Sequence, residues 1–481
     1  MSELLSYPLW NRALLVLYAA SALATAVHAL LNKRDPRSAW GWISVCWLFP
    51  LAGAVLYLLF GINRVQTRAQ RLVGATELPA PATRSLPAAV HALRLSAIDA
   101  VELSELVRIG DAVTGRPLVG GNRIVPLHNG EQAYPAMLEA IDRARHTVDF
   151  ATYLFRPGQA GERFAEALAA AQRRGVTVRV LLDGAADFFY RPRASRLLAR
   201  HGVRAELFLP LRWFPPMLHI NLRNHRKLLL VDGRVAFTGG MNIADWHYVE
   251  RPQRRPVADL HFALEGPVVA QIAEAFAADW QFATGDRPPP SPDPPAVSDG
   301  VAARVITDGP NEDLDKLQMV LLGAIASAHR RVWIMTPYFI PSPQLVAALQ
   351  SAALRGVDVS LVLPAKSDQF WVDAASRNHL PALLQRAVRV YYRPAPFAHT
   401  KLFVMDHYYA QLGSANLDNR SLRLNFELVV ETFDTALVEK LARHFEQVRA
   451  ISRELSYAEL AARPPAARLR DAFFWLFSQY L

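Results

Sequence analysis

The chain has 481 residues, a formal net charge of +10 and 52% hydrophobic residues. The length is enough for about two to four domains, and the basic charge favours nucleic acid, an anionic membrane surface or a phosphate-bearing substrate. The single cysteine, Cys46, excludes an internal disulfide framework and any zinc site built on cysteines.

The first 65 residues contain two long apolar runs. Ala13–Leu31 has 19 residues, which span about 28 Å as a helix, close to the thickness of the bilayer core. Ala39–Phe60 is the second run, and Pro50 interrupts it, which membrane helices tolerate. We therefore expect residues 1–65 to form a two-helix hairpin that makes the protein integral to the membrane and multi-pass.

Two alternatives remain open for this region. The first run could be a signal peptide, because Ala24-Thr25-Ala26 resembles a cleavage site, or both runs could be core helices of a soluble domain. Basic residues mark the cytoplasmic side of a membrane protein, but here they are nearly balanced between the two sides. A cytoplasmic catalytic region is the working expectation.

The rest of the chain is a connector followed by two similar halves. Pro79, Pro81 and Pro87 argue against one continuous helix in the connector, residues 66–115. The first half (116–284) predicts a helix from Met137, a strand over Thr147–Phe155, a helix over Phe164–Arg173 and a strand over Gly175–Leu182. After a proline-rich linker (285–300), the second half (301–481) repeats this order at Met319–Ser327, Val332–Phe339, Leu345–Leu354 and Gly356–Leu363. Strands that alternate with helices indicate a duplicated α/β layered domain.

Each half contains one copy of the pattern H-x-K-x4-D, with four apolar residues in the x4 slot. Side chains alternate between the faces of a strand, so the His and Lys of each copy point the same way. The apolar residues predict a buried strand that holds the pair. A glycine–asparagine tail follows each copy, which argues against a chance match. The motif residues are His225, Lys227 and Asp232 in the first half and His399, Lys401 and Asp406 in the second; the tails are Gly239 to Asn242 and Gly413 to Asn416.

This doubled motif resembles the phospholipase D superfamily. The stretch Gly413–Ser421, with Asn425-Phe426-Glu427, is similar to the second motif of bacterial cardiolipin synthases, and the N-terminal apolar runs match that family too. The resemblance implies two phospholipase D-like layered domains, each with helices on both sides of a mixed sheet, which pack face to face and share one active site. It also implies an enzyme of the bacterial inner membrane.

Two imidazoles, each beside a lysine, suit phosphodiester chemistry. One neutral histidine attacks phosphorus and forms a phospho-histidine, while the other donates a proton to the leaving alcohol. Lys227 and Lys401 would neutralise the non-bridging oxygens, helped by Asn242 and Asn416. Asp232 and Asp406 complete the catalytic motifs, and we expect them to brace the site rather than to touch phosphate.

Each ring also needs an acceptor for its other nitrogen. The family pattern places these acceptors at Asp259, 34 residues after His225, and at Glu427, 28 residues after His399. The unequal spacings make the halves only loosely equivalent here. Gly239 and Ser414 complete the supporting residues.

The remaining polar clusters carry no comparable signal. No other His/Asp/Glu cluster has metal-ligand spacing, and the His–Lys pairs supply the charge, so we predict an enzyme without metal or cofactor. Four further histidines are interpreted as structural: His219, His247, His261 and His407.

The leading hypothesis is a cardiolipin synthase that transfers a phosphatidyl group between two phosphatidylglycerol molecules and releases glycerol. Its partners would be membrane phospholipids and not nucleic acid. A hydrolytic phospholipase D, a superfamily nuclease and a non-catalytic membrane scaffold are the alternatives. The apolar runs and the lack of a distinct nucleic-acid motif count against the nuclease, and the intact motifs count against the scaffold.

Overall fold

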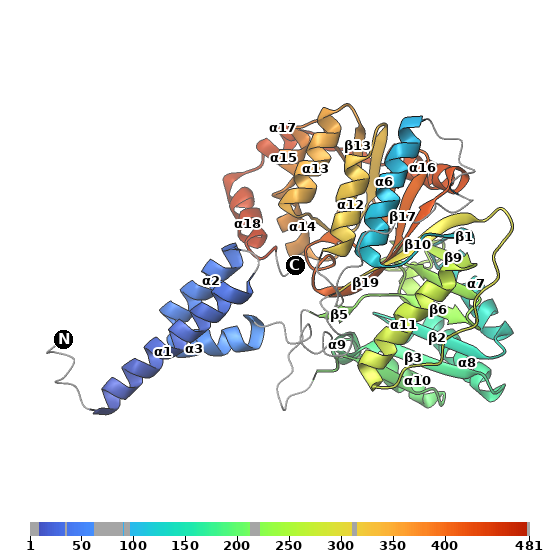
Figure 1. Cartoon of the computed structure of the whole chain (residues 1–481), viewed down its shortest axis with the longest axis horizontal. Helices are drawn as coiled ribbons and strands as arrows, with labels where there is room; N and C mark the ends of the chain where they lie inside the picture. The colour runs from blue at the N-terminus through green and yellow to red at the C-terminus, as the bar shows by residue number, and fades with distance from the viewer. Residues whose placement is uncertain are drawn as a thin grey trace. The chain divides into compact units, whose positions relative to one another are not determined.

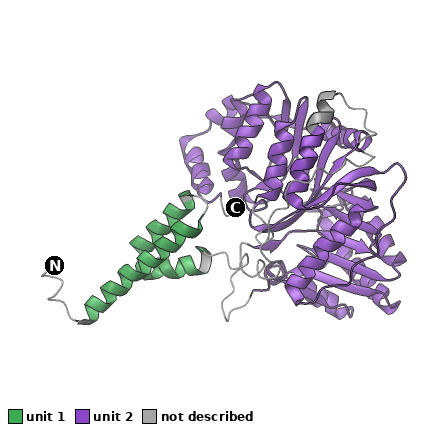
Figure 2. Cartoon of the chain, in the orientation of Figure 1, with its two compact units in different colours: residues 1–71, 212–218 green, residues 72–211, 219–481 purple. Residues whose placement is uncertain are grey.

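The structure is a computed structural model that describes residues 9–33, 36–61, 90, 97–211, 222–309 and 315–478. The chain forms two compact units, residues 1–71 with 212–218, and residues 72–211 with 219–481 (Figure 2). His219 and much of the predicted connector lie outside the described residues. Both halves of the repeat belong to the second unit.

The first unit consists of apolar helices: α1 (Leu9–Asn32), α2 (Pro36–Leu48), α3 (Pro50–Leu56) and a π-helical turn over Tyr57–Gly61. The predicted second span is divided, because Pro50 has no N–H to continue a helix and Phe49 leaves the helical region with φ −132° and ψ 70°. Among the described residues, only residues 10–32 of α1 are long and apolar enough to cross a membrane. The predicted hairpin is therefore supported for its first helix alone.

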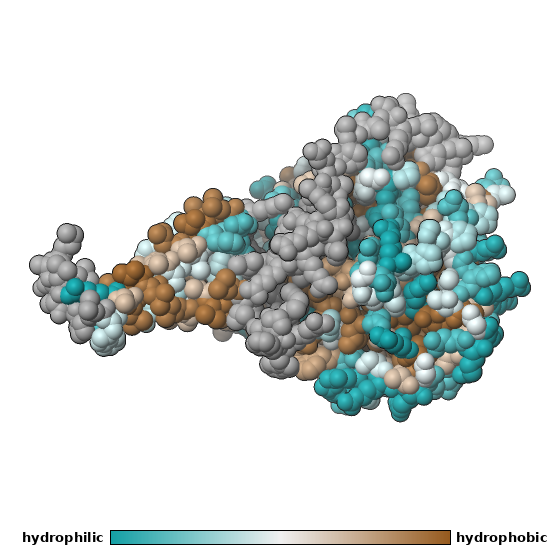
Figure 3. All heavy atoms as spheres, turned by 60° about the horizontal axis from the view of Figure 1, so that its bottom comes forward, coloured by the Kyte–Doolittle hydropathy of each residue, from teal (hydrophilic) through white to brown (hydrophobic). Residues whose placement is uncertain are grey.

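The helices of the first unit are apolar on the outside. Large side chains such as Leu15, Leu17 and Leu31 are exposed on α1, whereas Ala22 and Ala29 are buried. Figure 3 shows the apolar side chains gathered over these helices. A helix that is hydrophobic all round is typical of a membrane or of a large core, so this surface fits association with a membrane.

The second unit is built on one sheet of 16 strands that shows the duplication (Figure 1). The central neighbours are β1 (Val119–His128) and β10 (Val301–Asp308), which pair antiparallel. From β1 the order runs through β9 (Leu260–Glu265), β7 (Val235–Gly239), β6 (Leu228–Val231), β2 (Thr147–Thr152), β3 (Thr177–Asp183) and β4 (Ala205–Phe208). From β10 it runs through β19 (Asn425–Phe433), β17 (Tyr409–Gly413), β16 (Leu402–Met405), β11 (Arg331–Met335), β13 (Asp358–Pro364), β14 (Arg389–Arg393) and β20 (Arg453–Glu454).

The two halves therefore meet edge to edge in one continuous sheet, and the expected face-to-face packing is wrong. The reason is that β1 and β10 are the edge strands of their own halves, and each satisfies the backbone hydrogen-bonding groups of the other's edge. The connection places equivalent strands symmetrically about the β1–β10 pair.

Helices cover both faces of the sheet in each half, as predicted. In the first half α7 (Asn129–Arg143), α8 (Gln159–Arg173) and α10 (Ala194–Arg200) share a core with β2, β3 and β6, and α11 (Val268–Thr284) contacts β6, β7 and β9. In the second half Val332 and Ile334 of β11 join the core of α12 (Lys316–Ala326) and α13 (Pro343–Leu354). Trp333, which alternates with them, stacks on Phe445 of α16 (Thr435–Ala450) on the other face.

Smaller elements complete the second unit. The additional helices are α6 (Ala97–Thr114), α9 (Gly184–Phe189), α14 (Phe370–Arg377), α15 (Leu380–Leu384), α17 (Tyr457–Ala461) and α18 (Pro465–Trp475). Five two-residue strands also occur: β5 (Arg223–Asn224), β8 (Val257–Ala258), β12 (Phe339–Ile340), β15 (Phe397–Ala398) and β18 (Leu417–Asp418). Residues 285–300 between the halves contain no helix or strand.

Candidate active site

Both motif histidines lie on extended links between a two-residue strand and a buried strand. His225 and Lys227 lie between β5 and β6, and His399 and Lys401 lie between β15 and β16. The apolar parts of the motifs form strands as predicted, but the His–Lys segments precede those strands. Both histidines line the same cavity of about 770 Å³, so the structure brings the two motifs together at one site.

Each histidine is held in place by the other half of the chain. β5 pairs parallel with β19, and the backbone N–H of His225 donates to Phe426 O at 2.9 Å. β15 pairs parallel with β8 in the same way, and the N–H of His399 donates to Ala258 O at 2.8 Å. These two exchanges of short strands fix the histidines across the boundary between the halves.

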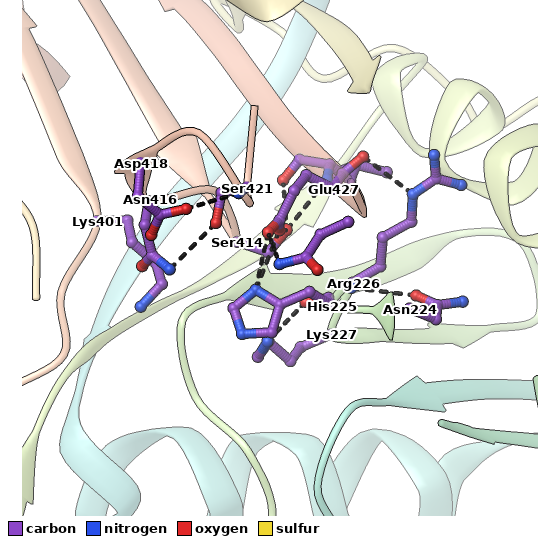
Figure 4. A network of polar contacts seen from close by, with 12 residues as sticks. Asn224, His225, Arg226, Lys227, Lys401, Ser414, Asn416, Asp418, Ser421 and Glu427 are labelled. Atoms are coloured by element: carbon purple, nitrogen blue, oxygen red, sulfur yellow. Dashed lines mark hydrogen bonds and ion pairs between the residues drawn. The ribbon is translucent and has the colours of Figure 1, made fainter. Parts of the chain in front are cut away.

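The acceptors of the imidazoles are crossed as well. His225 Nδ1 lies 2.9 Å from Glu427 Oε1, and His399 Nδ1 lies 3.0 Å from Asp259 Oδ2 (Figure 4 shows the first pair). The sequence correctly singled out both carboxylates, but it counted each from the histidine of its own half. A carboxylate on Nδ1 requires the proton there, so Nε2 is the nitrogen available for chemistry in each ring. In His399 this nitrogen lies 3.2 Å from Lys401 Nζ.

The two carboxylates are held differently. Ser414 Oγ donates to Glu427 Oε2 at 2.5 Å. Gly240 occupies the equivalent position in the first half, where a Cβ would lie 2.7 Å from both carboxylate oxygens of Asp259. Gly239 has φ 148°, a conformation that glycine adopts readily. Ser414 and Gly240 of the tails therefore lie directly against the carboxylates.

Both lysines are buried beneath the histidines and turn back to them. Lys227 Nζ donates to His225 O at 2.5 Å, and Lys401 Nζ donates to His399 O at 2.7 Å. Burial lowers the pKa of Lys227 to about 7 and that of Lys401 to about 8, against the opposing charges of Glu427 and Asp259. Such buried cations are stabilised by an added anion, so the surroundings of the two histidines are suited to a phosphate group.

The imidazoles and carboxylates have complementary charge states. Burial lowers the pKa of His225 to about 4, although Glu427 opposes the shift, and it also lowers the pKa of His399. Burial acts to raise the pKa of Asp259, but the hydrogen bond and charge of His399 lower it to about 2. The empty site therefore holds neutral imidazoles on ionised carboxylates at neutral pH, and a neutral imidazole is the form that can attack phosphorus.

The motif aspartates lie at the far ends of β6 and β16 from the histidines. Asp232 accepts hydrogen bonds from the backbone N–H groups of Arg145, His146 and Thr147 at 2.7–2.9 Å. Asp406 accepts from the N–H groups of residues 329, 330 and 331 at 2.7–3.0 Å. They anchor the starts of β2 and β11, as the bracing role requires. Asp232 is only partly buried, unlike Asp406.

The two tail asparagines both line the cavity but are satisfied differently. Asn242 Oδ1 accepts from the N–H of Leu154 at 3.1 Å. Asn416 Nδ2 donates to Ser421 Oγ at 3.1 Å, and no described residue contacts its Oδ1. The two asparagines therefore differ in their hydrogen bonds, although they occupy equivalent positions in the repeat.

Several residues near the site carried no clear signal in the sequence. Tyr153 and Tyr338 approach His225 and His399 edge-on, with ring centroids 5.2 Å and 6.4 Å apart. Tyr153 directly follows β2, whereas Tyr338 lies three residues after β11. With Thr152 and Thr336 as equivalent positions the two tyrosines are offset by one residue, so alignment of the two halves does not pair them. Arg226 donates to Glu427 O at 2.9 Å and to Asp279 at 2.6 Å, and only the fold reveals that it spans the halves.

The other histidines do not join the motif pair. His261 is buried on β9, and His247 lines the cavity with its Nδ1 3.3 Å from Val257 O. Burial lowers the pKa of His247 to about 3 and that of His261 to about 4. Among the described residues, no group of three His, Cys, Asp or Glu side chains could hold a metal ion.

Comparisons with known proteins agree with this geometry. A family model described as "Cardiolipin synthase, PLD-like domain" matches residues 137–280 and 321–449, and one described as "Phospholipase_D-nuclease N-terminal" matches residues 20–61. The chain is 34% identical over 465 residues to Cardiolipin synthase A of Serratia proteamaculans, covering 95% of each chain. It is 30% identical to Cardiolipin synthase of Geobacillus kaustophilus, covering 97% of this chain and 93% of the relative.

A solved structure shares the fold. The phosphatidylserine synthase of Haemophilus influenzae superposes with a TM-score of 0.61 at 14% sequence identity, covering 78% of this chain and 100% of that one. The likeness supports the architecture of the second unit.

Proposed function

The chain belongs to the cardiolipin synthase family of phospholipase D-like proteins, and we propose that it is a phosphatidyltransferase that converts two phosphatidylglycerol molecules into cardiolipin and glycerol. The observation that carries this proposal is the pair of histidines, one from each half, that line one cavity with a carboxylate of the opposite half on each Nδ1. One such site can make and break phosphodiester bonds in turn.

The proposed reaction has two steps in the same site. Nε2 of one histidine attacks the phosphorus of phosphatidylglycerol, and the bond between phosphorus and the glycerol oxygen breaks. The other histidine, which takes up a proton on Nε2 when the anionic phosphate binds, gives that proton to the oxygen, so glycerol leaves and a phosphatidyl-histidine remains. A hydroxyl of a second phosphatidylglycerol then gives its proton to the histidine that protonated the glycerol, and its oxygen attacks phosphorus. This attack forms cardiolipin and frees the histidine that carried the phosphatidyl group.

The other motif residues serve this reaction in distinct ways. Lys227 and Lys401 balance the charge that develops on the non-bridging oxygens when phosphorus becomes five-coordinate. Asp259 and Glu427 fix the tautomers and stabilise the protonated rings. Asp232 and Asp406 position the strands, and they do not contact the substrate.

The substrate is a membrane lipid, and we propose that α1 anchors the protein in the inner membrane of a bacterium. The α2–α3 segment would complete a second, broken crossing, and we propose that the catalytic unit lies in the cytoplasm. Exposed apolar side chains on α1 and the family match over residues 20–61 support the anchor. Cysteine-accessibility labelling of intact cells with the Arg196→Cys variant, an exposed position in the catalytic unit, would test the side, since a cysteine in the cytoplasm should resist an impermeant reagent.

Product analysis of the purified full chain tests the reaction. The protein is mixed with two phosphatidylglycerols of different acyl composition in detergent, and lipids and free glycerol are measured by mass spectrometry. Mixed cardiolipins and one glycerol per cardiolipin are the expected products, and a His225→Ala/His399→Ala double variant is the matched control.

Other products would identify the alternatives. Phosphatidic acid in place of cardiolipin would show a hydrolytic phospholipase D, in which water outcompetes the acceptor alcohol at the phosphatidyl-histidine. Cleavage of nucleic acid without turnover of phosphatidylglycerol would show a nuclease. A folded protein without turnover of either would show a scaffold.

A further inference from the structure

The wall of the cavity contributed by the second half is rich in hydrogen-bond acceptors. Asp418, Asn416 and Asn425 all line the cavity and are at most 5% exposed. No described residue donates a hydrogen bond to Asn416 Oδ1 or Asn425 Oδ1, although both atoms are buried. The orientation of Asn425 is fixed, because its Nδ2 donates to Glu427 Oε1 at 3.3 Å. Buried polar atoms without partners are rare in proteins, so this wall is suited to a ligand that supplies donors.

Asp418 is held rigidly in this wall. Its Oδ1 accepts from the backbone N–H of Ser421 at 2.6 Å, and the Ser421 hydroxyl accepts from Asn416 (Figure 4). The backbone of Asp418 belongs to β18, which pairs with β12. The carboxylate is thus held by its own turn, and the charge of Arg420, which also lines the cavity, acts to lower its pKa.

The first half does not offer the same groups. In the aligned motifs Ala244 takes the place of Asp418, and Val257 takes the place of Asn425. Asn242 takes the place of Asn416, but its Oδ1 is already satisfied by the N–H of Leu154. The acceptor wall is therefore not a requirement of the repeated fold, and it belongs to one side of the shared cavity.

The chemistry of the wall excludes the phosphate as its partner. An ionised phosphodiester has only acceptor oxygens, and a carboxylate repels it. Burial and the charge of Glu427 raise the pKa of Asp418 to about 6, although the Ser421 N–H opposes the shift. In phosphatidylglycerol, the only hydrogen-bond donors are the two hydroxyls of the headgroup glycerol. Because they are neutral, these hydroxyls can approach the wall without repulsion from the carboxylate.

We propose that Asp418, with Asn416 and Asn425, forms a polyol subsite that binds the headgroup glycerol of phosphatidylglycerol. This inference rests on the proposed function. The leaving glycerol occupies the subsite in the first step, and the headgroup glycerol of the second phosphatidylglycerol occupies it in the second, because both oxygens exchange protons with the same histidine. Selection of phosphatidylglycerol over phospholipids without headgroup hydroxyls follows from this subsite.

The test compares two donors that differ only in these hydroxyls. Release of the head alcohol is measured for phosphatidylglycerol and for phosphatidylethanol, with wild type, Asp418→Asn and Asp418→Ala. Wild type should prefer phosphatidylglycerol, and Asp418→Ala should reduce this preference in kcat/KM by roughly 10- to 100-fold, the range for lost hydrogen bonds to a charged group. The rate with phosphatidylethanol should change little by comparison. Asp418→Asn keeps the shape of the side chain and should show a smaller loss of preference.

The controls separate a subsite from general damage. Asp368 is another carboxylate of the same cavity, and it accepts from Tyr338 Oη at 2.7 Å; Asp368→Asn should change both donors by the same factor. If the Asp418 variants release glycerol and ethanol with the wild-type preference, the subsite is wrong and the proposed function stands. If wild type turns over neither donor, the proposed function fails and the subsite fails with it.

Discussion

Nδ1 of His225 lies 2.9 Å from a carboxylate oxygen of Glu427, a residue 202 positions later in the chain and in the other half of the repeat. The equivalent pair, His399 and Asp259, is 140 positions apart in the chain and crosses in the opposite direction. Neither motif histidine has its carboxylate in its own half. The two halves therefore depend on each other for the proposed catalysis.

Removal of the negative charge of either Glu427 or Asp259 should impair the whole site. Glu427→Gln and Asp259→Asn keep a hydrogen-bonding side chain but remove the charge that stabilises a protonated ring, so each should lower kcat by roughly 10²–10⁴-fold. Steady-state kinetics with circular dichroism would check activity and folding together. Glu265→Gln, a change on β9 at a partly exposed position, is the matched control and should leave kcat near wild type. A Glu427→Gln variant as active as this control would contradict the proposed role.

The lysines should act mainly in the transition state. Lys227→Met and Lys401→Met keep an apolar stem of similar reach and remove the charge, so kcat should fall more than KM rises. Arginine should rescue poorly, because its planar fork does not reproduce a point donor at the same distance. Full kinetic curves for the four variants would show the split, and wild-type kcat in both methionine variants would disprove the pairing of His with Lys.

The activity should also depend on pH through the lysines. The pKa of Lys227 is about 7 and that of Lys401 about 8, so raising the pH through this range removes charge from the substrate-free site. Because kcat/KM reports the free enzyme, it should fall as pH rises above about 7–8. Bound phosphate holds the protons, so kcat should fall only at higher pH. A profile of kcat/KM that stays flat up to about pH 10 would show that lysine charge is not required.

Chelators should leave the transfer rate unchanged, because the two lysines are proposed to supply the positive charge. Turnover of phosphatidylglycerol with and without EDTA measures this directly. Loss of turnover with EDTA, followed by recovery with a divalent metal, would replace the metal-free mechanism.

The sequence predicted the parts of the site that repeat along the chain. The doubled motif, the order of strands and helices, and helices on both faces of the sheet all follow from local patterns that the structure retains. Asp259 and Glu427 were expected as acceptors from the resemblance to the superfamily. Their crossed pairing was not predictable from spacing, because it depends on the two-residue strands β5 and β15, which pair with β19 and β8 of the opposite half only after the halves meet.

Other differences have equally local causes. Pro50 divides the second apolar run, and composition alone does not show where a helix ends. The acceptor wall around Asp418 was missed because the motif comparison looked for what the two halves share. Asp418 provides a carboxylate that its counterpart in the first half, Ala244, does not have.

The central claim is that both histidines serve one site through a covalent intermediate. The reaction of wild type with phosphatidylglycerol is quenched rapidly under conditions that leave phosphatidyl-histidine intact. Intact-mass and peptide mass spectrometry then measure the number of phosphatidyl groups attached to each chain. One group at most, on His225 or on His399 but not on both, is the predicted result, and His225→Ala and His399→Ala should each abolish transfer by several orders of magnitude. Two groups on one chain, or a single variant that keeps about half of the wild-type rate, would show two independent sites and contradict the account.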